Sequence, residues 1–162
     1  MDVQEAIRTL RSVREFRDES LPDDVLAGIL DAGRRAQSSK NTQPVRFIVV
    51  RERATLQALS TTGDYAGHLA GAAAGVVLVS TVPHEYDLGQ ITAFLMLAAW
   101  EQGVGSCIAA IYRAEQVREM LGIPEEMHVH WALSFGYPAE GWTPAKMGGR
   151  RSLDDVAHWN RW

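Results

Sequence analysis

The sequence of 162 residues has a single cysteine, and this scarcity excludes two kinds of structure. One thiol, Cys107, cannot close a disulfide within the chain and cannot supply a cysteine metal site. The histidines add little, because His128 and His130 could share one face of an extended segment but have no third ligand in view. We therefore expect a packed or solvated role for these two histidines and no bound metal.

Strong charge and long apolar runs are also missing. Sixteen Lys and Arg residues against 20 Asp and Glu residues give a net charge of −4, so there is no electrostatic case for a nucleic acid or membrane partner. No apolar run is long enough to span a bilayer, and the first residues contain no apolar signal core. We expect one cytoplasmic domain over residues 1–162, large enough to bury a real core.

The sequence does contain clear helix and strand patterns. Asp2 and Glu5 have the spacing of a capping box, which predicts a first helix from there. Further helices are expected from residues 20–24 onward, over 52–60, 86–102 and 113–121, and strands over 47–50, 75–82 and 129–135. The core stripe of the second helix is expected at Val25, Ile29, Ala32 and Ala36. These patterns predict a mixed fold with at least three strands, and residues 61–69 have no clear period.

The segment 86–102 is apolar on nearly every side. Such a helix is buried either in the core or in a subunit interface, and a chain of this size has limited room to bury it alone. An interface is therefore favoured. Trp159 and Trp162 are costly to leave in water, so we also expect the C-terminal tail to dock on a protein body, this chain's or a partner's.

Residues 38–44, SSKNTQP, form a loop made almost entirely of hydrogen-bonding side chains, between a helix and the strand at 47–50. Pro44 should push Gln43 towards an extended conformation and keep the helix from running on. The run at 47–50 is continuous and β-branched, which is typical of a buried strand. The loop suits a planar polar ligand, although an ordinary turn rich in Ser and Asn has the same composition.

Two other segments suit a ligand. Arg11, Ser12 and Arg14 place two guanidinium groups and a hydroxyl close together, which suits a phosphate, although a solvated basic patch is the alternative. The small residues of 103–111 permit close approach of the backbone to a ligand. Their spacing matches neither a nucleophile elbow nor a dinucleotide fingerprint, and a tight connector is the alternative.

Taken in order, these segments resemble the signatures of the nitroreductase family. Residues 38–47, SSKNTQPVRF, resemble the PS-x-x-N-x-QPWRF loop of that family, R-S-V-R-x-F at 11–16 resembles its first signature, and residues 150–156 resemble its C-terminal one. The sequence departs from the family at four positions. Gln37 and Ser152 replace a usual proline, Val45 replaces tryptophan, and Leu10 stands where many members have a basic residue.

The resemblance implies an α+β fold with a central, mostly antiparallel sheet flanked by helices, forming a homodimer with FMN at the interface. It implies a phosphate site at Arg11, Ser12 and Arg150, with Arg151 as the alternate arginine. It places Arg14 near flavin N1 and the C2 carbonyl. The remaining implied contacts are the groups that read the polar edge of the ring and the backbone donors to N5, namely Ser38, Ser39, Asn41, Gln43, Ala109, Ala110 and Ile111.

The implied activity is transfer of reducing equivalents from NADH or NADPH through FMN to a nitroaromatic, quinone or similar small acceptor, by a ping-pong mechanism. No side chain is expected as a catalytic acid or base, because the flavin carries the chemistry. Two alternatives remain open. One is a non-catalytic flavin-binding module, favoured by Leu10, and the other is a specialised relative that dehalogenates or fragments its own flavin.

Overall fold

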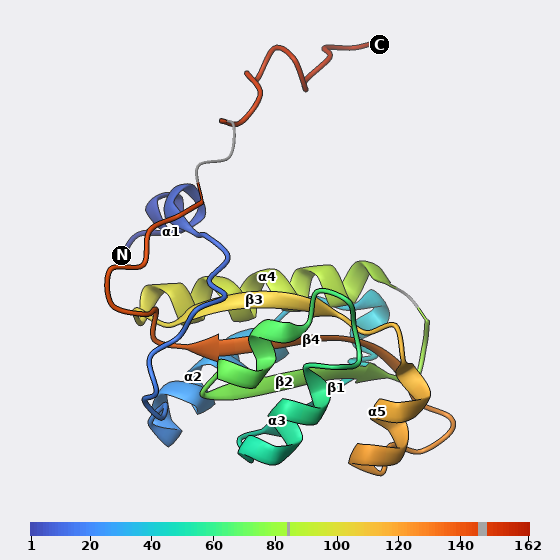
Figure 1. The fold of residues 1–162 in the computed structure, drawn as a ribbon. Coiled ribbons are helices and arrows are strands. Elements are labelled where there is room, and N and C mark those ends of the chain that lie inside the picture. The colour runs from blue at the N-terminus through green and yellow to red at the C-terminus, as the bar shows by residue number, and fades with distance from the viewer. Residues whose placement is uncertain (84, 146–148) are drawn as a thin grey trace.

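The computed structural model describes residues 1–83, 85–145 and 149–162, and its described part is built on one antiparallel sheet with helices on both faces (Figure 1). The expected α+β class is confirmed. In chain order the elements are α1 (Val3–Thr9), α2 (Asp23–Arg34), the 3₁₀ turn η1 (Ser39–Asn41), β1 (Val45–Val50), α3 (Arg53–Leu59), the 3₁₀ turn η2 (Gly67–Gly71), β2 (Ala74–Ser80), α4 (Glu85–Glu101), β3 (Gly105–Ala110), α5 (Ala114–Leu121) and β4 (His128–Gly136).

The strands lie in the order β1-β2-β4-β3, so β2 and β4 are central and β1 and β3 form the edges. Every residue of β2 is buried, as expected for the strand predicted over 75–82. The strand expected at 47–50 is confirmed as part of β1, but the expectation that it is buried was wrong, because Val50 is the buried residue of β1 and Val49 is 38 % exposed. The apolar run is present, but it lies on an edge strand that pairs with β2 on one side.

The small-residue segment 103–111, which had no predicted strand, forms β3 on the other edge. Its glycine allows a close approach, since a Cβ on Gly105 would lie 2.6 Å from the side chain of the fully buried Val13. Through this contact the segment after α1 runs beside β3, and Ser12 forms a parallel bridge to Ser106. Phe16 bridges to Pro138 further on. The N-terminal signature is therefore anchored along one edge of the sheet.

Two apolar clusters hold the layers together. The first joins α2 and α4 to one face of the sheet through residues such as Ile29, Leu95 and Phe135, and the second joins α3, η2 and α5 to the other face. The buried line of α2 is Leu26, Ile29 and Gly33, which differs from the expected stripe. A Cβ on Gly33 would lie 2.5 Å from Leu95, so the missing side chain is what lets α2 and α4 approach.

Helix α4 is only partly covered within this chain. Its inner face is buried, whereas Tyr86 is 78 % and Phe94 is 37 % exposed. Helix α1 packs beside its end, where Trp100 Nε1 donates to Thr9 Oγ1 over 3.0 Å. The apolar side chains of α1, Val3 and Ile7, remain 71 % and 57 % exposed. An apolar surface on α1 and α4 therefore faces away from the core.

The C-terminal segment 149–162 extends away from the sheet and its helices (Figure 1). Trp159 is 78 % exposed and Trp162 is fully exposed, so the tail does not dock on the body of its own chain. Docking on a partner stays a prediction. Within the described residues, no helix combines the length and apolarity that crossing a bilayer requires.

Candidate functional site

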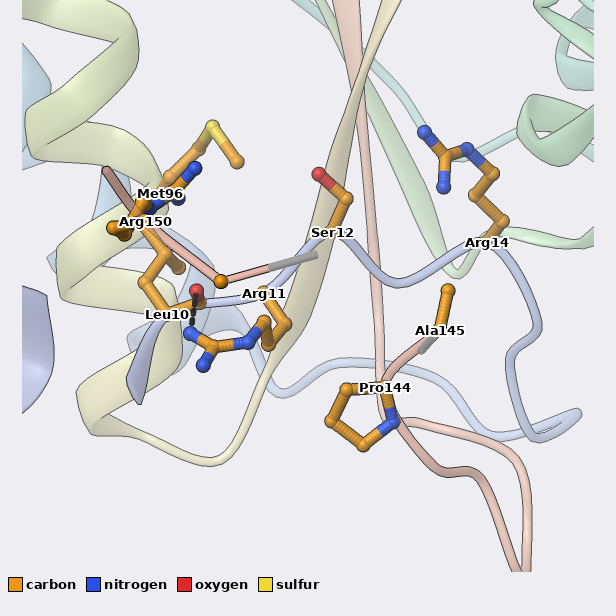
Figure 2. Close-up of a pocket in the computed structure, with 9 residues that line it drawn as sticks. Leu10, Arg11, Ser12, Arg14, Met96, Pro144, Ala145 and Arg150 are labelled. Atoms are coloured by element: carbon orange, nitrogen blue, oxygen red, sulfur yellow. Dashed lines mark hydrogen bonds between the residues drawn. The ribbon is translucent and has the colours of Figure 1, made fainter. Parts of the chain in front are cut away.

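A cavity of about 430 Å³ lies where the segment after α1 meets α4 and the C-terminal segment (Figure 2). It brings together Arg11, Ser12, Arg14 and Arg150, four of the residues expected to hold a cofactor. The other lining residues are Leu10, Met96, Pro144, Ala145 and Gly149. Arg151 is exposed and does not line the cavity, so the geometry favours Arg150 of the two neighbouring arginines.

Local structure explains how Ser12 and Arg14 reach this cavity. The Val13 N–H donates to the Ser106 carbonyl over 2.9 Å, and the Val13 side chain is fully buried. Because side chains alternate along an extended segment, burying Val13 turns both neighbours away from the core. Ser12 and Arg14 are accordingly exposed, beside the outer edge of β3.

The arginines fall into two groups. Arg11 Nη1 donates to the carbonyls of Arg8 and Leu10 over 3.0 and 2.8 Å, which fixes its side chain at the end of α1. Its Nε and Nη2 make no bond among the described residues, so they can serve a ligand. Figure 2 shows Arg11 and Arg150 on one side of the cavity and Arg14 on the other, with Ser12 between them. One anionic group can therefore contact Arg11 and Arg150 while Arg14 contacts another part of the ligand.

The Arg14 side chain lies close to Cys107 on β3. Burial raises the pKa of the Cys107 thiol above its ordinary value, while the charge of Arg14 and hydrogen bonding from Ser12 and Arg14 act in the opposite direction. The net effect keeps the group protonated at neutral pH, and a buried thiol is a poor nucleophile. Cys107 therefore lines the region behind Arg14 without offering a reactive thiolate.

His68, in η2, is a residue that sequence reasoning missed. The residue is 9 % exposed, and Nδ1 lies 2.8 Å from Ser134 Oγ. Burial lowers the pKa of His68, the backbone of Ile108 raises it, and the charge of Arg14 lowers it further. The residue lies in the stretch 61–69, where the apolar residues follow neither a helix nor a strand periodicity, so nothing in the sequence pattern pointed to it.

The proposed donors to N5 lie at the end of β3 and just beyond it. Ala109 is fully buried, whereas Ala110 and Ile111 are partly exposed, so a ligand outside the strand can reach the latter two. The next two N–H groups, of Tyr112 and Arg113, both donate to the Thr62 carbonyl, over 2.9 and 3.0 Å. The backbone that presents Ala110 and Ile111 is thereby held against the loop that follows α3.

A second cavity, of about 410 Å³, lies beside the polar loop. Ser38 and Gln43 line it, together with Arg46 and residues of α2 and α4, while Ser39 and Asn41 are exposed on η1 next to it. Lys40, Asn41 and Gln43 have φ values of 52, 54 and 47°, in the left-handed region. Several such residues in one loop are typical of a functional segment, because each costs about 1 kcal/mol or more.

The expectation that Pro44 holds Gln43 in an extended conformation was wrong, since its φ is positive. Two hydrogen bonds hold the residue instead. Ser38 Oγ accepts the Gln43 N–H over 2.9 Å, and Arg46 Nη1 donates to the Gln43 carbonyl over 2.7 Å. Contacts on both sides of Gln43 therefore override the local preference before proline.

The two cavities belong to opposite edges of the sheet. Ser12 runs beside β3, and the polar loop leads directly into β1. With the order β1-β2-β4-β3, three interstrand spacings separate these edges, about 14 Å. The two cavities also lie near opposite ends of the strands. Val45 in β1 pairs with Ser80 in β2, and Ser80 pairs with His128 at the start of β4. Ser106 in β3 instead pairs with Phe135, near the end of β4. One chain does not bring the two halves of the expected site together.

The sequence and the fold of this chain both match known proteins. A model of the nitroreductase family matches residues 7–74 and 84–137. The chain belongs to the nitroreductase family. An Archaeoglobus fulgidus protein, named for NADH dehydrogenase and NAD(P)H nitroreductase activity, is 35 % identical over 146 residues, covering 83 % of this chain and 84 % of that protein.

Solved nitroreductase-family structures agree with this fold. A Parabacteroides distasonis structure, carrying the same kind of name, has a TM-score of 0.87 at 26 % identity and covers 98 % of each chain. A Desulfovibrio desulfuricans nitroreductase, solved in complex with FMN, has a TM-score of 0.83 at 25 % identity, covering 100 % of this chain and 98 % of that one. The similarity therefore extends over nearly the whole nitroreductase fold.

Proposed function

We propose that this nitroreductase-family protein is a cytoplasmic flavoprotein oxidoreductase that binds FMN and passes reducing equivalents from NADH or NADPH to a small acceptor such as a nitroaromatic or quinone. The observation that carries the proposal is the cavity at the β3 edge, which Arg11, Ser12 and Arg150 line together, with Arg14 on its other side. Two arginines and a hydroxyl suit the phosphate of FMN. Arg14 is then available for the ring.

The donor set fits FMN in its polarity as well as its charge. Leu10 is apolar, so the positive charge at the phosphate end comes from Arg11 and Arg150 rather than from a basic residue at position 10. Ala110 and Ile111 are partly exposed, and their backbone N–H groups are the proposed donors to the N5 side of the ring. This arrangement supports a flavin lying along the outer edge of β3, with its phosphate near α1.

A second copy of the chain would complete the site. Ser38, Ser39, Asn41 and Gln43 lie at the opposite sheet edge, so we infer that the loop of one subunit meets the β3 edge of the other in a homodimer. The exposed apolar side chains support this assembly, because surfaces of this kind mark protein–protein contacts. Those on α1, α4 and the tail are Val3, Ile7, Tyr86, Phe94, Leu153, Val156, Trp159 and Trp162.

When bound, FMN supplies the redox chemistry, taking reducing equivalents from NAD(P)H and passing them to the acceptor in separate half-reactions. The protein's task is to hold and polarise it. Arg14 stabilises negative charge that develops near N1 and the C2 carbonyl. Backbone N–H groups at Ala110 and Ile111 orient the N5 side. Cys107 stays a thiol and takes no covalent part.

Absorbance spectra test the proposal directly. The purified protein is refolded or incubated with FMN, freed of excess ligand, and treated anaerobically with NADH and with NADPH. We expect one FMN per subunit and bleaching of the yellow colour by at least one nicotinamide. A yellow protein that neither nucleotide bleaches would indicate a non-catalytic flavin-binding module. A colourless protein would refute both.

A further inference from the structure

The second cavity, of about 410 Å³ and here called the α2–β1 groove, combines an apolar floor with three charged side chains. The floor is formed by Leu30, Ala36, Pro44, Val45, Phe47, Val49 and Ile91, and the charged residues are Arg34, Arg46 and Asp87. The proposed function uses only Ser38 and Gln43 of this groove. The rest of the lining suits a short peptide segment that carries apolar side chains and the opposite charges.

The two arginines of the groove are exposed and retain donors for a ligand. Arg46 Nη1 donates to the carbonyls of Gln43 and Val45 over 2.7 and 3.0 Å, while its Nε and Nη2 make no bond among the described residues. Arg34 pairs through Nη2 with Asp31, and its Nε and Nη1 likewise have no bond in the described part of the chain. Each guanidinium can therefore bind a carboxylate.

The C-terminal tail contains a segment of matching chemistry. Residues 152–157 form one turn, in which the Ser152 N–H donates to the Asp155 carboxylate and the Asp155 N–H donates to Ser152 Oγ, both over 3.2 Å. Leu153 and Val156 are three residues apart, so they share one side of this turn, and they are 69 % and 58 % exposed. Asp154 is also exposed. The turn satisfies its own backbone and presents its apolar side to the exterior, which marks a contact surface.

The charges of the two surfaces are complementary in both signs. Residues 151–156 read RSLDDV, with one arginine and two aspartates, whereas the groove has two arginines and one aspartate. Asp154 makes no hydrogen bond or ion pair among the described residues, so its carboxylate is available to an arginine. Complementary charges of this kind favour one partner and one register over others.

The turn cannot reach the groove of its own chain. Arg150 lines the cavity at the β3 edge, and Leu153 follows three residues later, at most about 10 Å away. The groove belongs to the β1 edge, about 14 Å across the sheet and near the opposite end of the strands. The tail also extends away from the sheet (Figure 1). In the inferred homodimer, by contrast, the loop that carries Ser38 and Gln43 meets the partner's β3 edge, so the groove begins near the partner's tail.

We propose that the turn at 152–157 of each subunit docks in the α2–β1 groove of its partner, with Leu153 and Val156 on the apolar floor and Asp154 facing Arg34 and Arg46. The inference rests on the proposed function, because the inferred homodimer brings the groove to the tail. Docking also holds Arg150 at the flavin-phosphate site, since only two residues separate it from Leu153. Arg34 is then a positioning residue, which acts on FMN through the tail of the other subunit.

A charge swap tests the docking in the flavin-free protein. Arg34→Glu and Asp154→Arg are made singly and together, and Arg46 is left intact because it also holds Gln43. Each single change should weaken the dimer about tenfold or more in sedimentation equilibrium, because it brings like charges together in the interface. The double variant should regain most of the wild-type affinity. Failure of the second change to rescue the first would overturn the proposal.

Arg35→Glu is the matched control for the groove. Arg35 follows Arg34 at the end of α2 and also pairs with Asp31, with Nε 2.7 Å from Oδ2, but it does not line the groove. This variant should dimerise like the wild type, and combining it with Asp154→Arg should restore nothing. Equal effects of Arg34→Glu and Arg35→Glu would show that Arg34 acts through the helix end alone, against the proposal.

Cross-linking identifies the occupant of the groove. Ala36→Cys protein is mixed with Leu153→Cys protein and treated with a short bismaleimide, while the native Cys107 is buried. We expect a covalent dimer with one chain of each kind, and no product when Ala54→Cys, exposed on α3, replaces Ala36→Cys. A double variant linked only within single chains would assign the groove to the chain's own tail. No product with Ala36→Cys would leave the groove to an unrelated partner, and either result would overturn the proposal.

FMN titration gives a separate readout of the effect on Arg150. At protein concentrations where all variants are dimeric, Arg34→Glu should bind FMN more weakly, and adding Asp154→Arg should restore the affinity. An FMN affinity equal to that of the wild type would overturn the link from the groove to Arg150. A protein that binds no FMN would refute the proposed function, whereas sedimentation and cross-linking would still decide the docking. If FMN binds and the charge swap rescues nothing, the docking fails and the proposed function stands.

Discussion

Gly63 lies in the loop after α3 and is in close contact with the strand that presents the proposed N5 donors. An added Cβ would overlap the Ala110 carbonyl oxygen and lie 3.0 Å from its carbon. Both are backbone atoms, so no side-chain rotation can relieve the contact. In Gly63→Ala the loop and Ala110 must separate by roughly 1 Å to restore ordinary packing.

The expected destabilisation combines two effects. Overpacking of this kind costs about 1–3 kcal/mol. The separation also strains the two bonds that Tyr112 and Arg113 donate to Thr62, each contributing about 1 kcal/mol. Alanine has less conformational freedom than glycine in the unfolded chain, and this offsets roughly 0.5–1 kcal/mol of the loss in stability. The free energy of unfolding of Gly63→Ala should therefore fall by about 2–4 kcal/mol.

Urea unfolding followed by circular dichroism measures this change, with Gly67→Ala as the matched control. Gly67 lies in neighbouring η2, and its added Cβ would meet no atom within 4 Å. The control should match the wild type or gain up to about 1 kcal/mol. In the FMN-loaded protein, Gly63→Ala should also slow flavin reduction, since a displacement of about 1 Å at a reacting centre can cost a hundredfold in rate. A Gly63→Ala protein within 0.5 kcal/mol of Gly67→Ala, at roughly equal denaturant dependence, would refute the reasoning.

Three further predictions follow from the site. Arg150→Ala should weaken FMN binding about ten- to a hundredfold in fluorescence titrations, because it removes a charge-assisted contact of about 1.5–3 kcal/mol; an equal loss in Arg151→Ala would contradict the choice between them. Arg14→Ala should lower the FMN midpoint potential at saturating flavin, and a wild-type potential would refute its place near N1. The free energy of unfolding should fall as pH drops below 6.5, the ordinary pKa of histidine, because the unfolded chain binds the His68 proton first; His68→Gln should reduce this slope, and an unchanged slope would show that the folded ring protonates normally.

Local patterns in the sequence were sufficient for much of the fold. The capping role of Asp2 is confirmed by its 2.8 Å bond from the Glu5 N–H, and Gly122 ends α5 with a φ of 63°. Both features depend on residues within one turn of each other. The buried strand β2 was also predicted correctly, since both of its faces are covered and its apolar run is continuous.

The misses concern contacts between distant residues. The small residues that form β3 carry little strand propensity, and the segment becomes a strand because β4 pairs with it. Gly33 adds nothing to an apolar stripe, yet a Cβ there would lie 2.5 Å from Leu95 on α4. The positive φ of Gln43 depends on Ser38 and Arg46, which override the preference imposed by Pro44.

The candidate site, like the fold, was predicted only in part. The sequence by itself determined which residue types were present for a flavin: the arginines and serine at 11–14, the polar loop at 38–44 and the paired arginines at 150–151. Only the tertiary structure brought Arg150 into one cavity with Arg11, placed Arg14 on the other side of that cavity, and put the polar loop at the opposite edge of the sheet. It also brought His68 against Ser134, 66 positions away. Sequence patterns reflect periodicity over a few residues, whereas these placements depend on strand order and on close packing between elements far apart in the chain.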